Sequence, residues 1–132
     1  MAVRLLLLVV GLYHALNALA MLLFPREWAA AVVHLDSPTP LHLHFIADIG
    51  MAFLASGAAM IWSARRGMAF APWAIAGAAW PALHSSIHLY GWVMMGLPVT
   101  TRDMLSESIG VILISLAGIA LAWLRQRQGA TQ

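Results

Sequence analysis

The sequence lacks cysteine and lysine and has few charged residues of any kind. Of its 132 residues, only 9% are charged and 62% are hydrophobic, whereas soluble domains carry about 25% charged residues. So few polar side chains could not cover the apolar residues of one domain in water, and lipid is therefore the expected solvent. The absence of cysteine excludes disulfides, thiolate metal ligands, Cys-ligated iron–sulfur clusters and cysteine nucleophiles. Histidines and carboxylates must carry any chemistry.

Long apolar stretches dominate what is present. Four of them, residues 3–24, 41–62, 68–92 and 103–124, reach the roughly 20 residues that a helix needs to cross a hydrocarbon core. The segment 27–35 is too short to cross, and we expect it to form an interfacial helix. The sequence thus predicts one all-α domain over residues 1–132: an integral membrane four-helix antiparallel bundle with a short interfacial helix between spans one and two.

The arginines are distributed unequally between the two ends of these spans. Cytoplasmic loops of membrane proteins carry an excess of basic residues, so the richer end is predicted to be cytoplasmic, and with it both termini. The net charge is only +2 and the arginines are scattered, which argues against a nucleic-acid partner. The richer end has Arg4, Arg65, Arg66, Arg125 and Arg127, and the other end has Arg26 and Arg102.

Two local signals shape the predicted helices. Pro81 follows Trp80 inside the third span, and because proline removes a helical hydrogen bond we expect a kink there. Thr100 and Thr101 precede the fourth span as predicted N-cap residues, with Asp103 favourably placed in the first turn.

Ionisable side chains gather in the outer halves of the spans, in pairs four residues apart. Residues with this spacing share one helix face, and ionisable groups at membrane depth are functional candidates. Imidazole and carboxylate groups are the expected ligands of Cu, Zn or Fe. The pairs are His44 with Asp48, His84 with His88, and Asp103 with Glu107. We therefore predict a site for a divalent transition metal ion with the ligands His44, Asp48, His84, His88 and Glu107.

Other interpretations of these residues stay open. The same cluster could be a hydrogen-bonded structural network, a proton path or a ligand pocket. His14 lies nearer the membrane midplane, where it is a candidate cofactor-binding residue, such as an axial ligand of a haem, or a hydrogen-bonded packing residue. His34 and His42 are expected to be solvated at the interface.

Several enzyme classes lack their motifs. Neither Glu27 nor Glu107 belongs to a Glu-x-x-His pair of the kind used by di-iron bundles. The sequence also has no His-Glu-x-x-His helix, Gly-rich phosphate loop or serine nucleophile elbow.

Two segments carry a resemblance to known proteins. With LHLHFIADIGMAFLASG opening the second span and WPALHSSIHLYGW closing the third, the chain resembles small bacterial four-helix membrane proteins of the DoxX-like and related uncharacterised groups. Some DoxX-like relatives are associated with oxidoreductase complexes. The thiol chemistry suggested for part of that group cannot apply to a chain without cysteine.

Together these observations predict a small integral subunit or accessory protein of a bacterial inner-membrane complex, with a His/carboxylate metal site near the periplasmic face. A haem is the alternative cofactor. The alternative functions are a quinone, lipid or proton-handling site in a small membrane oxidoreductase or transporter, or a purely structural subunit. Small-residue helix faces lead us to expect a homo-oligomer or a larger membrane-protein complex.

Overall fold

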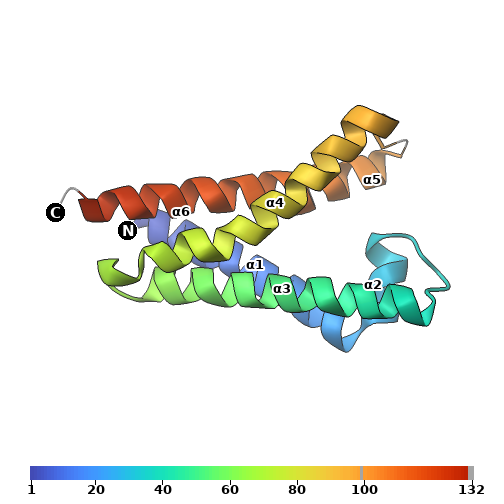
Figure 1. The fold of residues 1–132 in the computed structure, drawn as a ribbon, viewed down its shortest axis with the longest axis horizontal. Helices are drawn as coiled ribbons and strands as arrows, with labels where there is room; N and C mark the ends of the chain where they lie inside the picture. The colour runs from blue at the N-terminus through green and yellow to red at the C-terminus, as the bar shows by residue number, and fades with distance from the viewer. Residues whose placement is uncertain (99, 131–132) are drawn as a thin grey trace.

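The structure is a computed structural model that describes residues 1–98 and 100–130, and this part of the chain is helical without strands. The predicted all-α fold is confirmed. The last three elements follow one another without a break and form one long helical segment (Figure 1). The elements are α1 (Ala2–Leu23), α2 (Pro25–Val32), α3 (Pro40–Arg65), the 3₁₀ turn η1 (Met68–Phe70), α4 (Pro72–Met95), α5 (Thr101–Leu105), the π-helix η2 (Ser106–Leu113) and α6 (Ile114–Ala130).

Within residues 1–98 and 100–130, three helical segments are long and apolar enough to cross a membrane. They are Ala2–Leu23, Pro40–Arg65 and Thr101–Gln128. Helix α4 is of similar length, with 24 residues, but is outside this group. Its C-terminal half carries polar residues, among them His84 and His88, which lower its hydropathy. The composition of the helices therefore supports three of the four predicted spans directly.

The long helices contact one another in a closed order. Helix α1 packs on α3, α3 on α4, α4 on α6, and α6 returns to α1. Glycines allow two of these contacts to be very close, because a Cβ atom at Gly57 would lie 2.7 Å from the carbonyl oxygen of Gly11. A Cβ atom at Gly77 would likewise lie 2.7 Å from the carbonyl oxygen of Ser56. Small residues thus set the helix spacing, as expected for packing in lipid.

The two ends of the molecule differ in how tightly they are closed. We name them the termini end, which holds the start of α1, the α3–α4 turn and the end of α6, and the α2–α5 end opposite (Figure 1). Helix α4 changes direction along its length and contains Pro81, in agreement with the predicted kink. Its C-terminal half and α5 therefore diverge from α2 and α3.

Arg125 closes the termini end from inside. Its side chain is only 1% exposed, and its guanidinium donates to the carbonyl oxygens of Ser63 at 2.9 Å, Arg66 at 2.8 Å and Gly67 at 3.3 Å. Nearby, Arg4 Nε donates to the carbonyl oxygen of Ala64 at 2.8 Å. The last carbonyls of a helix have no partner within it, so these two arginines satisfy the C-terminal end of α3.

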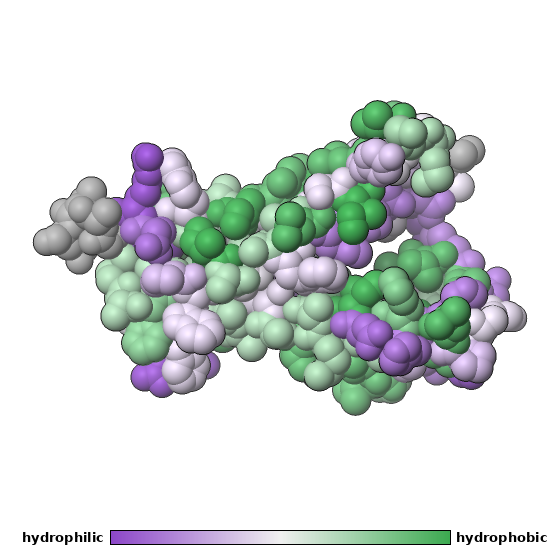
Figure 2. Space-filling model, in the orientation of Figure 1, coloured by the Kyte–Doolittle hydropathy of each residue, from purple (hydrophilic) through white to green (hydrophobic). Residues whose placement is uncertain are grey.

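The outer surface is largely apolar. Hydrophobic residues cover the middle of the face seen in Figure 2, and hydrophilic residues gather toward its two ends. On α1, whose buried face includes Leu7 and His14, the opposite face exposes large apolar side chains. These are Leu5, Leu6, Val9, Leu12, Leu16, Leu19 and Leu23.

Candidate functional site

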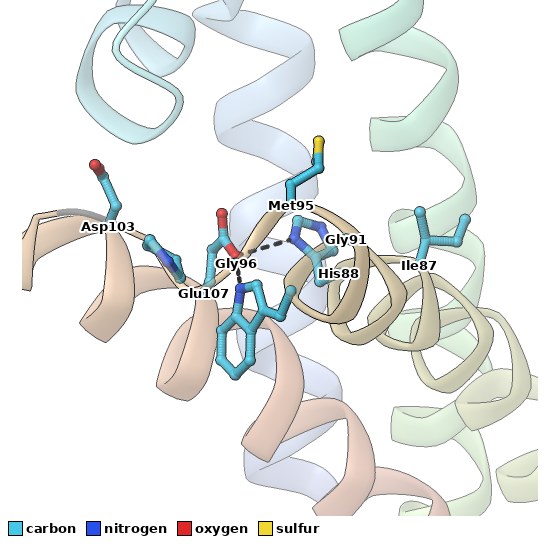
Figure 3. Close-up of a pocket in the computed structure, with 9 residues that line it drawn as sticks. Ile87, His88, Gly91, Met95, Gly96, Asp103 and Glu107 are labelled. Atoms are coloured by element: carbon cyan, nitrogen blue, oxygen red, sulfur yellow. Dashed lines mark hydrogen bonds and ion pairs between the residues drawn. The ribbon is translucent and has the colours of Figure 1, made fainter.

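Three ionisable residues meet between α4 and η2. The rings of His84 and His88 are 5.0 Å apart, on one face of α4, as their spacing predicts. His88 Nδ1 lies 3.7 Å from Glu107 Oε2, and Trp92 Nε1 donates to the same carboxylate oxygen at 2.6 Å (Figure 3). Glu107 is therefore held by two groups of α4. We call His84, His88 and Glu107 the histidine–glutamate group.

The π-helix η2 turns Glu107 toward α4. In a π-helix the hydrogen bonds run from i to i+5, so residues about five apart come into line. Glu107 is five residues before the buried Ile112, and the wide turn places both on the inner side. The hydroxyl of Tyr13 donates to the carbonyl oxygen of Gly110 at 2.8 Å and ties η2 to α1. The sequence predicts a helical span over residues 103–124, and the structure shows that part of this span is a π-helix.

His14 lies deeper, behind an aromatic partition. Its side chain is 1% exposed, and its ring stacks on Phe53 with a centroid distance of 5.3 Å. Phe53 in turn meets the ring of His84 edge to face at 5.4 Å, and Trp80 stacks on His84 at 5.7 Å. Phe53 therefore separates His14 from the histidine–glutamate group.

The nitrogen atoms of His14 make no hydrogen bond. Within the described part of the chain, neither ring nitrogen has a partner, and the same is true of Trp80 Nε1 and Ser115 Oγ. His14 is packed in the core, without the hydrogen bond that the alternative role as a hydrogen-bonded packing residue requires. Because protein atoms enclose both nitrogens, a haem could reach His14 only after the surrounding helices had moved apart. Haem binding stays a prediction.

His44 and Asp48 form a separate, exposed pair. His44 Nε2 lies 3.3 Å from Asp48 Oδ2, and the two side chains are 72% and 63% exposed. They share a face of α3, as predicted, but that face is not buried against α4. The five predicted metal ligands thus divide into this pair and the histidine–glutamate group. Residues 1–98 and 100–130 contain no set of three or more His, Asp or Glu side chains arranged to hold a metal ion.

A third His–carboxylate pair connects α5 to the loop after α2. His34 Nε2 lies 2.8 Å from Asp103 Oδ1, and Arg102 Nη2 donates to the carbonyl oxygen of Ala31 at 2.9 Å. The His34 side chain is 34% exposed, in keeping with the expected solvation, and its contact with Asp103 adds to that expectation. The two partners are far apart in sequence and share no periodicity, and no sequence signal pointed to this contact.

The predicted N-cap of the last helical segment is present. Thr100 Oγ1 accepts a hydrogen bond from the backbone N–H of Asp103 at 3.1 Å, so Thr100, of the two predicted threonines, is the N-cap. His42 is exposed, as expected, and forms a reciprocal capping box with Thr39 at the start of α3. Neither His42 nor Thr39 contributes to the histidine–glutamate group.

A pocket of about 460 Å³ opens beside the histidine–glutamate group (Figure 3). His88, Asp103 and Glu107 supply its ionisable side chains, and the rest of its lining is mostly apolar. The side chains of His88 and Glu107 are 29% and 32% exposed, so both are accessible from the pocket. The complete lining is Ile87, His88, Gly91, Trp92, Met95, Gly96, Pro98, Asp103 and Glu107.

The histidine–glutamate group has two neighbouring imidazoles, one of which pairs with a carboxylate. Imidazole both accepts and donates a proton near neutral pH, and a neighbouring carboxylate stabilises its charged form. Comparison with known protein families, with curated proteins and with solved structures finds no match for this chain.

Proposed function

We propose that this chain is a four-span protein of a bacterial inner membrane, with both termini in the cytoplasm. Helices α1 and α3 and the segment from α5 to α6 have the required apolar length, and α4 lies between α3 and α6 as the fourth span. Five of the seven arginines are at the termini end, which favours a cytoplasmic position for that end.

Reporter fusions at the two ends of the chain test this topology. Four spans place both ends on the same side, whereas three spans would place them on opposite sides. We expect alkaline phosphatase to be inactive at either end and a cytoplasmic fluorescent reporter to be active at both. Phosphatase activity at one end would show that α4 does not cross.

We further propose that the histidine–glutamate group handles protons, as part of a small subunit of a membrane oxidoreductase or transporter. The observation that carries this proposal is the contact series from the pocket inward: Glu107 to His88 at 3.7 Å, then His88 to His84 at 5.0 Å between ring centroids. Glu107 and His88 exchange protons at the pocket. His84 receives or supplies the proton on the inner side.

Phe53 and the apolar core limit how far a proton could travel. Beyond His84, Phe53 blocks direct transfer to His14. Toward the termini end the core is formed by apolar side chains, including Leu7, Met60 and Ala78. The proposal is therefore a proton-accepting site that opens to one side, and not a continuous path across the membrane.

Histidine NMR of the full chain in lipid nanodiscs tests the proton site. We expect the imidazoles of His84 and His88 to titrate as a coupled pair, and the Glu107→Gln variant to change the titration of both. Asp48→Asn is the matched control, because Asp48 also pairs with a histidine but lies on the exposed face of α3. Independent titration of His84 and His88, with no effect of Glu107→Gln on His84, would overturn the proposal.

A divalent metal ion is the second candidate for this pocket. It is favoured by one observation: His88, Asp103 and Glu107 line the same pocket, although they do not approach one another as a ligand set. Metal analysis of purified protein separates the two proposals. A bound metal that is lost in His88→Ala and kept in His44→Ala would favour metal binding over proton handling.

A further inference from the structure

A second pocket lies at the termini end, between the α3–α4 turn and α6. It has a volume of about 550 Å³ and combines an apolar wall with two polar side chains, Gln126 and Arg127. The apolar wall is formed by Met68, Ala69, Ala71, Pro72 and Trp123. We call this pocket the Arg127 groove. Its lining suits a molecule that is partly apolar and partly polar.

The electrostatic environment of the Arg127 groove is one-sided. The chain has only five Asp and Glu residues, and all of them precede the midpoint of α3 or lie in α5 and η2. No carboxylate side chain is therefore close to the five arginines of the termini end. In such a field an anion is attracted and a cation is repelled.

Arg127 is placed to meet that anion. Two of the five arginines at this end, Arg4 and Arg125, donate to helix carbonyls and are used internally. The Arg127 guanidinium instead lies over the Trp123 ring, 3.9 Å from its centroid, at the edge of the groove. Stacking of this kind fixes the plane of the guanidinium and leaves its N–H groups at the edge available to a phosphate oxygen.

Three tryptophans at the same end of the bundle as the Arg127 groove are each about half exposed: Trp62, Trp73 and Trp123. Exposed tryptophans mark the level of lipid headgroups. The Arg127 groove therefore lies where a phospholipid phosphate would lie, with its apolar wall at the level of the first acyl carbons.

We propose that the Arg127 groove binds an anionic phospholipid, with Arg127 holding the phosphate and Trp123 packing against the glycerol and upper acyl chain. This inference rests on the proposed membrane insertion with the termini end at the cytoplasmic surface. The N-terminus of α4, which begins at Pro72 without a side-chain cap, adds positive partial charge beside the groove.

Native mass spectrometry of the full chain, released from nanodiscs of mixed lipid, tests the proposal. The nanodiscs contain equal amounts of phosphatidylglycerol and phosphatidylcholine. We expect phosphatidylglycerol to be retained preferentially, and Arg127→Gln to reduce its retention about fivefold, the effect of one basic side chain near a charged lipid surface. Arg65→Gln is the matched control, because Arg65 is at the same end and does not line the groove.

Two separate measurements report lipid binding in the groove and insertion into the membrane. Equal retention of the two lipids, or equal losses in Arg127→Gln and Arg65→Gln, would overturn the groove as a specific site. Recovery of the protein in floated liposomes reports membrane insertion separately, so a failure of insertion would be seen on its own. Soluble glycerol phosphate, added in excess, should not displace the lipid if the acyl chain contributes to binding.

Discussion

The termini end and the α2–α5 end are built on opposite principles. At the termini end, Arg125 is buried and its guanidinium is satisfied by the carbonyls that end α3. At the α2–α5 end, ionisable groups are partly exposed and are held by single long-range pairs, such as His34 with Asp103 and His88 with Glu107. A buried hydrogen-bond network holds the termini end together beside the Arg127 groove, whereas partly exposed pairs surround the pocket at the α2–α5 end.

The buried network at the termini end stabilises the fold, whereas the exposed pairs at the α2–α5 end include the group proposed to handle protons. A buried guanidinium with several carbonyl partners resists change, because moving it exposes several unpaired groups at once. A half-exposed imidazole beside a carboxylate can change its protonation without disturbing the packing. The comparison therefore predicts that substitutions at the two ends will differ in kind, and the following variants test it.

The largest effect is expected for Arg125→Leu. The substitution removes the guanidinium that donates to the carbonyls of Ser63, Arg66 and Gly67, and a hydrogen bond from a charged group contributes about 1.5–3 kcal/mol. We expect the free energy of unfolding to fall by more than about 3 kcal/mol, measured by thermal or denaturant unfolding in detergent. Arg65→Leu, at the same end, should have little effect. Similar stabilities for the two variants would show that the network does not close this end.

A smaller loss is expected for Gly57→Ala, at the contact of α1 and α3. The added Cβ would lie 2.7 Å from the carbonyl oxygen of Gly11, and backbone cannot move aside cheaply. Overpacking of this kind costs about 1–3 kcal/mol. Gly91→Ala is the control near the open end, because its Cβ would meet only Met95 Cε at 3.6 Å. There the higher helix propensity of alanine should raise the free energy of unfolding by about 0.5–1 kcal/mol. Changes of opposite sign in the unfolding free energies of Gly57→Ala and Gly91→Ala would support the difference between the two ends, and changes of the same sign would contradict it.

The His34→Ala variant should cost about 1 kcal/mol, because an exposed ion pair contributes little. The main change should be local: faster hydrogen exchange in α2, which loses one of its ties to α5. His34 also has a positive φ of 55°, a conformation that glycine adopts more readily. His34→Gly should therefore be more stable than His34→Ala. If the two variants are equally stable, backbone strain at this position is negligible.

The smallest effect is expected for His44→Ala. This residue pairs with Asp48 on an exposed helix face, and such i, i+4 pairs contribute about 0.2–0.5 kcal/mol. Unfolding should be almost unchanged, and the imidazole signals of His84 and His88 should keep their titration. A large change in those signals would show that His44 belongs to the functional site, as the sequence predicts.

The histidine pairs show how far helical periodicity can lead. Spacing placed His84 on the same face as His88, and His44 on the same face as Asp48, and both placements are confirmed. The spacing of residues could not show which helix face is buried. In α3 the buried face includes Ile46, Gly50 and Phe53, so His44 and Asp48 lie outside it, and Phe53 takes the inner position beside His84.

The sequence by itself determined the all-α fold, its long apolar helices, the proline in α4 and an N-cap at Thr100 or Thr101, because each depends on residues close together in the chain. Only the tertiary structure decided the π-turn that aims Glu107, the burial of Arg125, and the pairing of His34 with Asp103. These features depend on contacts between distant segments. Local periodicity fixes which residues share a face, but helix packing decides what that face meets.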